Sequence, residues 1–147
     1  MARSVIAVIV GYIVMVILQI AAFMTLYALV GTSWSFKPRS YQASTRWTVA
    51  QFLIIAVTAI IAGLVCAAIA KGGRTPLVLA IVALVLGLGA AVAKTTFRPP
   101  DKHEVRVGSL SQVEAMNKAW HPTWVLFLGP FVAAAGIAIG GKLKKRS

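Results

Sequence analysis

The chain has 147 residues, of which 59% are hydrophobic and only 12% are charged. Soluble domains carry about 25% charged residues, so this composition excludes an ordinary soluble domain and indicates a membrane protein. The chain has 15 Lys and Arg residues against 3 Asp and Glu residues, a net charge of +12. Because these cations lie outside the apolar runs, where lipid phosphates attract them, we expect the lipid bilayer as a partner and no nucleic acid.

Four apolar runs without Asp, Glu, Lys or Arg occupy residues 5–30, 49–70, 76–93 and 124–141. A bilayer core about 30 Å thick needs roughly 20 helical residues, so the last two runs, about 18 residues each, barely reach across. We expect an all-α polytopic membrane protein, a single domain over residues 1–147 with four transmembrane helices in a bundle. A cleaved signal peptide would also explain the first run, but that run exceeds a signal core in length and lacks a small-residue cleavage site, so we expect it to remain.

The first run carries two polar side chains seven residues apart, Tyr12 and Gln19, which share one helical face. Polar groups inside a membrane often mark a transport pathway, so one hypothesis is a small polar track around Gln19. The alternative is a single hydrogen bond between helices, worth about 1 kcal/mol or less.

The loop after the first run interleaves aromatic residues with cations. Aromatic residues next to Lys and Arg are typical of anchors at the level of the lipid headgroups. Across the chain we expect five such interfacial anchors: Trp34, Tyr41, Trp47, Trp120 and Trp124.

Gly72 and Gly73 permit a tight turn between the second and third runs, which predicts an antiparallel hairpin of these two helices. In the next loop, Ser111 precedes Glu114 by three residues, the spacing of a capping box. This spacing predicts a short helix over residues 112–120 that lies in the membrane interface. The expected fold is therefore four spans plus one short interfacial helix in the second outer loop.

Small residues recur at helical spacing in the last three runs, and Gly136 and Gly140 form a GxxxG pair. Because lipid provides no hydrophobic drive between helices, close contact through small residues is a main source of packing energy. Such faces pack either within one chain or against a second copy or a larger membrane protein. The predicted packing residues are Ala59, Gly63, Ala67, Ala83, Gly87, Ala91, Gly129, Ala133, Gly136 and Gly140.

Cations close to the runs predict the orientation. The short segments on the side of the termini hold Arg3, Lys71, Arg74, Lys142, Lys144, Lys145 and Arg146. The cations of the other side are spread over two longer loops: Lys37, Arg39, Arg46, Lys94, Arg98, Lys102, Arg106 and Lys118. Because short segments near the spans carry the most weight, we expect both termini in the cytoplasm.

Side chains able to ligate a metal gather in the second outer loop: Asp101, His103, Glu104, Glu114 and His121. Their spacing matches no zinc or calcium motif, and the chain has no catalytic triad order, Walker loop, GxGxxG or CxxC. We therefore expect no catalytic residue, no metal site and no cofactor. The leading hypothesis is a non-enzymatic structural or accessory membrane protein that packs through its Gly/Ala faces, and the alternative is a small transporter or channel using Gln19.

Four spans in a short chain resemble the small multidrug resistance exporters, but residues 5–30 lack the glutamate on which that family depends. The segments "IAVIVGYIVMVIL", "FKPRSYQAST" and "PTWVLFLGPFVAAAGIAIGGKL" resemble a group of small bacterial four-span inner membrane proteins without an established function. This second resemblance implies a location in the bacterial inner membrane and assigns no activity.

Overall fold

The computed structural model describes residues 1–71, 73–97, 105, 114 and 118–146. In this part of the chain, four long helices follow one another: α1 (Ala2–Ser35), α2 (Thr45–Ala70), α3 (Thr75–Phe97) and α5 (Thr123–Arg146). Each is long and apolar enough to cross a membrane, which confirms the predicted all-α fold with four potential spans. The short helix predicted over residues 112–120 lies largely outside the described residues.

Local sequence signals account for the ends of α2 and the start of α3. The Ser44 hydroxyl caps α2 by accepting a hydrogen bond from the Trp47 backbone N–H at 3.1 Å. At its other end, Lys71 adopts a left-handed conformation with φ of 54°, which terminates the helix. Pro76 stands in the first turn of α3, where its missing N–H is tolerated. The connection between α2 and α3 is therefore as short as the sequence predicts.

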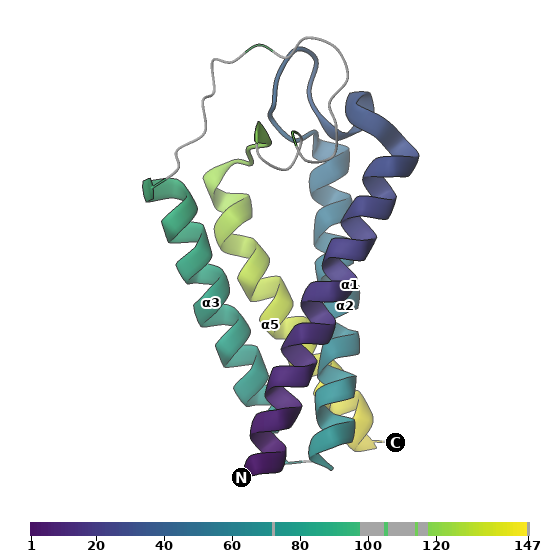
Figure 1. The fold of residues 1–147 in the computed structure, drawn as a ribbon, viewed down its shortest axis with the longest axis vertical. Helices are drawn as coiled ribbons and strands as arrows, with labels where there is room; N and C mark the ends of the chain where they lie inside the picture. The colour runs from purple at the N-terminus through teal and green to yellow at the C-terminus, as the bar shows by residue number, and fades with distance from the viewer. Residues whose placement is uncertain (72, 98–104, 106–113, 115–117, 147) are drawn as a thin grey trace.

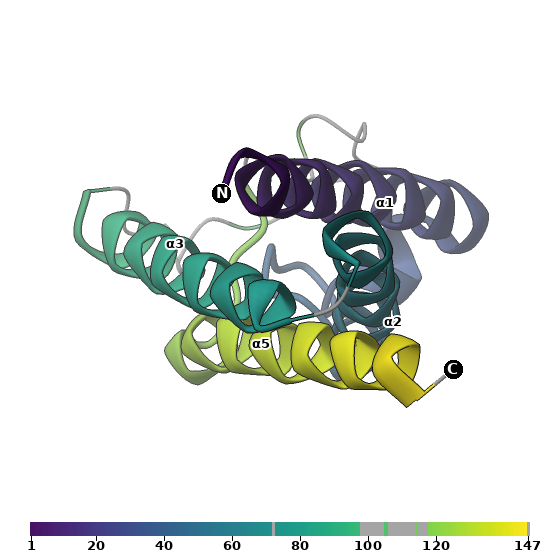
Figure 2. The same cartoon turned by 90° about the horizontal axis from the view of Figure 1, so that it is seen from below.

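The helices do not pack in chain order (Figures 1 and 2). α2 packs against α1 on one side and against α5 on the other, and α5 in turn packs against α3. α1 makes no close backbone approach to α5, and α3 has few contacts with α1 or α2. The spatial order is therefore α1, α2, α5, α3, so the predicted hairpin partners α2 and α3 meet mainly through α5.

The bundle is tightly closed at the end that carries both termini (Figure 1). There the Thr75 hydroxyl lies 3.5 Å from the Ser4 hydroxyl, and Arg3 Nε donates to the Ile69 carbonyl at 2.7 Å. Farther up the same half, a Cβ on Gly11 would lie 2.8 Å from Leu79 Cδ2, so the glycine leaves room for the Leu79 side chain between α1 and α3. Toward the loops, α3 diverges from α1 (Figure 1).

The loop end is held together by short backbone bridges. Trp120 donates its N–H to the Tyr41 carbonyl at 3.1 Å and accepts from the Ala43 N–H at 3.0 Å. The Ser44 hydroxyl donates to the Trp34 carbonyl at 2.6 Å. The Trp120 bonds connect the segment before α5 to the loop between α1 and α2, and the Ser44 bond joins the two ends of that loop. None of these bonds involves α3.

Candidate ligand cleft between α1 and α3

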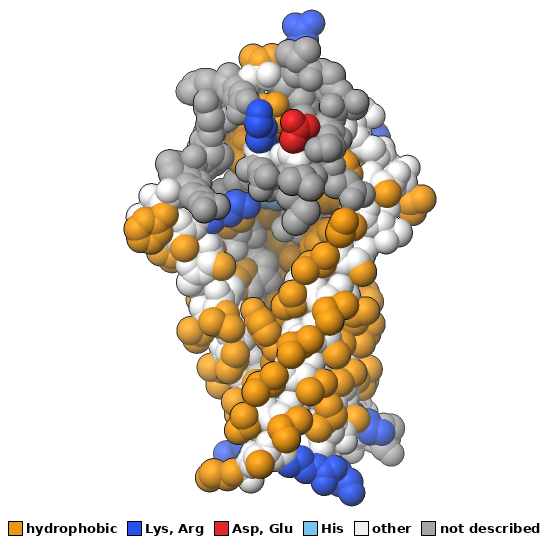
Figure 3. Space-filling model, in the orientation of Figure 1, with side chains coloured by type: hydrophobic (Ala, Val, Ile, Leu, Met, Phe, Trp, Pro, Cys, Tyr) orange, Lys and Arg blue, Asp and Glu red, His pale blue; other side chains and the backbone are white. Residues whose placement is uncertain are grey.

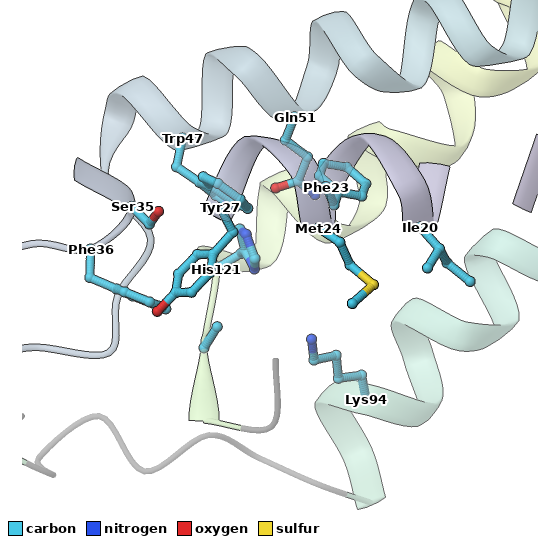
Figure 4. A pocket seen from close by; sticks show the side chains of 11 residues that line it. Ile20, Phe23, Met24, Tyr27, Ser35, Phe36, Trp47, Gln51, Lys94 and His121 are labelled. Atoms are coloured by element: carbon cyan, nitrogen blue, oxygen red, sulfur yellow. The ribbon is translucent and has the colours of Figure 1, made fainter. Parts of the chain in front are cut away.

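Two adjoining cavities lie between the loops and the middle of the bundle. The outer cavity, about 310 Å³, lies beneath the loops and contacts all the helices except α5 (Figure 4). The deeper cavity, about 370 Å³, lies among all four helices. Gln51 of α2 and Lys94 of α3 line both cavities, so the two spaces meet at these side chains. We call the combined space the cleft.

Buried polar atoms without partners mark the loop end of the cleft. Gln51 Oε1 and both ring nitrogens of His121 are shielded from solvent and have no hydrogen-bond partner among the described residues. Native proteins leave few buried polar atoms unpaired, because each such atom has lost its water without a replacement. These three atoms therefore point to a molecule that completes their hydrogen bonds.

Lys94 reaches into the same space from the opposite side. Figure 4 shows its amino group extended from α3 toward the cavity, while Gln51, Tyr27 and His121 lie across from it. Burial, together with the positive charge of Lys94, lowers the pKa of His121 from 6.5 to about 4. His121 is therefore neutral at pH 7, with one ring nitrogen as donor and the other as acceptor. No described residue that lines either cavity carries a carboxylate.

Aromatic side chains form the α1–α2 wall of the outer cavity. The Trp47 ring lies 6.2 Å from the rings of both Phe23 and Tyr27. Such ring pairs hold large side chains in fixed positions. Met24 of α1 and Phe36 complete this wall, so most of the outer cavity is apolar.

Small residues shape the deeper cavity. Of the predicted packing residues, Ala83, Gly87, Ala91, Gly129 and Ala133 line it. Their short side chains leave open space where larger ones would fill the gap between α3, α5 and the other two helices. The two residues of the predicted polar track, Tyr12 and Gln19, line the same cavity from α1.

The other predicted packing residues lie near the terminal end, where α2 meets α5. A Cβ on Gly63 would collide with the Ile137 carbonyl oxygen, and a Cβ on Gly140 would collide with that of Ile60. A Cβ on Gly136 would lie 2.7 Å from that of Ala59. Ala67 is buried in the same half of α2. The GxxxG face of α5 is thus covered by α2 of the same chain.

The predicted interfacial anchors occupy different environments. Tyr41 is only 6% exposed, and Lys118 Nζ lies 5.2 Å from its ring centroid. Trp34 and Trp47 pack edge to face, with ring centroids 6.5 Å apart. Trp124 is 59% exposed and stacks on Phe52 at 6.3 Å. Trp120, half-buried, forms the backbone bridge described above.

Sequence reasoning noticed Lys94 and His121 singly, as an outer cation and a possible metal ligand, and did not single out Gln51. It did not group them, because they come from three separate segments and no spacing connects them. The described residues contain no cluster of three or more His, Cys, Asp or Glu side chains able to hold a metal. Asp101, His103 and Glu104 lie outside the described residues.

Comparison of the chain with known proteins finds no matching family model, no similar curated protein and no similar solved structure.

Proposed function

We propose that this chain is a non-enzymatic, multi-pass protein of the bacterial inner membrane that binds a lipid in the cleft between α1 and α3. The observation that carries the proposal is the cleft itself, an apolar space that ends in buried polar atoms without partners. Ligand pockets in proteins measure about 300–1,000 Å³ and combine apolar walls with a few polar groups, as both cavities do.

The position of the cleft favours a lipid over a water-soluble ligand. Lys94 lies within one turn of the loop-side end of α3, and Gln51 lies in the second turn of α2, so both are near one membrane surface. In the space-filling view, the surface between α1 and α3 is hollowed in its upper half, on a side covered by hydrophobic side chains (Figure 3). A lipid can enter sideways through this opening, with its head near the surface and its chain in the apolar part.

In the proposed accessory role, the GxxxG pair of α5 does not bind a partner protein, because α2 of the same chain packs against it. Gly136 and Gly140 are occupied by α2, and a second copy or a larger membrane protein cannot reach them while the bundle is intact. The Gly/Ala faces thus build the bundle, and the cleft provides the function. A partner protein, where one exists, would contact other surfaces.

Binding can be tested by native mass spectrometry of the detergent-purified protein titrated with phosphatidylglycerol. We expect one saturable adduct per chain. Ala90 lines the deeper cavity, so Ala90→Trp should fill the cleft and weaken binding at least about tenfold. Ala135 is an exposed alanine of α5 that lines neither cavity, so Ala135→Trp is the matched control and should bind normally. No adduct, or equal binding by both variants, would overturn the proposal.

A second candidate function is transport along the polar side chains of the cleft. Tyr12 and Gln19 line the deeper cavity below Gln51, so polar groups continue into the bundle. Against a through-path, Gly11 packs on Leu79 and Cys66 closer to the termini. If this candidate is correct, Gln19→Leu should reduce the flux of a solute in proteoliposomes. Unchanged flux for every solute carried by the native protein would contradict the transport hypothesis.

We further propose that both termini face the cytoplasm. The terminal end of the bundle carries Arg3, Lys71 and Arg74 next to the cationic end of α5, which supports this orientation under the positive-inside rule. Reporters fused to the two ends should both give cytoplasmic signals, and a periplasmic signal from either end would contradict the orientation.

A further inference from the structure

The polar end of the cleft contains both hydrogen-bond donors and hydrogen-bond acceptors, so a ligand that pairs with all of them must supply both acceptors and donors. Lys94 and the N–H of neutral His121 are donors, and the lysine is a full positive charge. Acceptor oxygens complete their hydrogen bonds, and an anion is the strongest partner for Lys94, whose side chain is exposed. Gln51 Oε1 and the second ring nitrogen of His121 are acceptors. They require hydrogen-bond donors from the same ligand.

These demands separate the common classes of lipid head. A fatty acid carboxylate supplies acceptors only, so the acceptor nitrogen of His121 would stay unpaired. Ethanolamine heads supply N–H donors, but their ammonium group is repelled by Lys94. Choline heads carry a positive charge and no donor. A phosphodiester whose alcohol keeps free hydroxyl groups supplies both an anion and donors.

We infer that the cleft selects an anionic phospholipid with hydroxyl groups on its head, as in phosphatidylglycerol. The phosphate lies beside the Lys94 amino group, and the two head hydroxyls donate, one to Gln51 Oε1 and the other to the acceptor nitrogen of His121. The acyl chain lies against Phe23 and Met24, on the apolar wall that α1 provides. The inference rests on the proposed function, because it specifies the head of the lipid that the cleft binds.

The test uses three lipids with identical acyl chains and the unmodified protein, with affinities measured by native mass spectrometry. Phosphatidylmethanol has the charge of phosphatidylglycerol but no hydroxyl, and phosphatidylcholine has neither net charge nor hydroxyl. We expect phosphatidylglycerol to bind about fivefold more tightly than phosphatidylmethanol, because the hydroxyl completes buried hydrogen bonds. Phosphatidylcholine should bind at least about tenfold more weakly than phosphatidylmethanol, because it lacks the net charge.

Two variants test whether Lys94 and Gln51 cause these lipid preferences. Lys94→Gln should abolish the preference for phosphatidylmethanol over phosphatidylcholine, and Lys37→Gln should preserve it, because Lys37 is an exposed loop lysine that lines neither cavity. Gln51→Leu should abolish the preference for phosphatidylglycerol over phosphatidylmethanol. Gln19→Leu should preserve that preference, because Gln19 lines only the deeper cavity.

The outcomes distinguish this inference from the proposed function. Equal binding of all three lipids would overturn the head selectivity and leave lipid binding intact. Binding of none would overturn both. Preferences that survive Lys94→Gln and Gln51→Leu would overturn the assignment to these residues. Should either variant fail to fold, the lipid series on the unmodified protein still decides whether the head is selected.

Discussion

At the residue scale, His121 shows most clearly how the fold changes the chemistry of a side chain. In the sequence it is one of two histidines in a polar loop, with nothing to separate it from a surface residue. The fold buries both of its ring nitrogens and places it opposite Lys94 (Figure 4). Its low pKa follows from an arrangement of three segments and is therefore invisible to any reading of local sequence.

The lowered pKa of His121 predicts a loss of stability in acid. The unfolded chain takes up the proton near pH 6.5, whereas the folded chain takes it up only near pH 4. The free energy of unfolding should therefore be unaffected by His121 above about pH 6.5 and should fall between pH 6.5 and 4, by at most about 3 kcal/mol. Thermal unfolding in detergent at pH 7.5 and 4.5 measures this change.

The His121→Gln variant is the control for that experiment. Its side chain stays neutral, so its unfolding temperature should drop less between pH 7.5 and 4.5 than that of the native protein. The difference between the two proteins isolates His121 from other groups that titrate in this range. An equal drop in both proteins would show that His121 does not remain neutral in the folded state.

At the element scale, the four helices could be predicted because each is encoded by one long uncharged apolar run. Which helices pack against each other could not be predicted. The spacing of Gly63 and Ala67 identifies a face of α2, but it does not say whether that face meets α3, α5 or another chain. Chain order suggested α3, whereas the backbones that fit most closely are those of α2 and α5. Selecting them required complementary surfaces, which are a tertiary property.

The contact between α2 and α5 predicts a sharp contrast between two glycines. Gly63→Ala places a methyl group against the Ile137 carbonyl and should lower the free energy of unfolding by about 1–3 kcal/mol, because backbone must move. Gly89→Ala in α3 is the control, since nothing lies within 4 Å of its Cβ position. This control should keep or slightly raise stability, because alanine favours the helix.

Thermal unfolding of both glycine variants in one detergent checks the contrast. Equal stability of the two variants would show that α2 and α5 do not approach as closely as the structure indicates.

The cleft could be predicted from the sequence only in part, for a related reason. Tyr12 and Gln19 share one helix, so their common face could be read from their spacing, whereas Gln51, Lys94 and His121 come together only when the bundle assembles.

At the scale of the whole molecule, the unequal ends of the bundle follow from where each helix is attached. α3 is joined to α2 at the terminal end and rests along α5, where Pro130 fills the space above Gly87, with its Cγ 2.7 Å from the position of a Cβ there. α1 is fixed to α2 at the loop end by the rings around Trp47. No such contact joins α1 to α3 near the loops among the described residues, so the two helices separate there (Figure 1).

The difference between the two ends of the bundle predicts that the loop end, rather than the terminal end, is flexible and changes when the ligand binds. Spin labels at Val5 and Leu77 report the terminal end, and labels at Leu29 and Phe97 report the loop end, in a background that carries Cys66→Ser. All four positions are exposed, so the labels fit without repacking the core. The distance between labels should be longer and more broadly distributed for the loop-end pair, because few contacts restrain α1 against α3 there.

Phosphatidylglycerol should narrow the distance distribution of the loop-end pair and leave that of the terminal pair unchanged. A lipid seated between α1 and α3 contacts both helices and supplies the restraint that the protein itself lacks, whereas the terminal end is already closed around Gly11 and Leu79. Phosphatidylcholine should have a smaller effect at equal concentration. A response at the terminal pair, or equal responses to the two lipids at the loop-end pair, would contradict a ligand held at the loop side by its head.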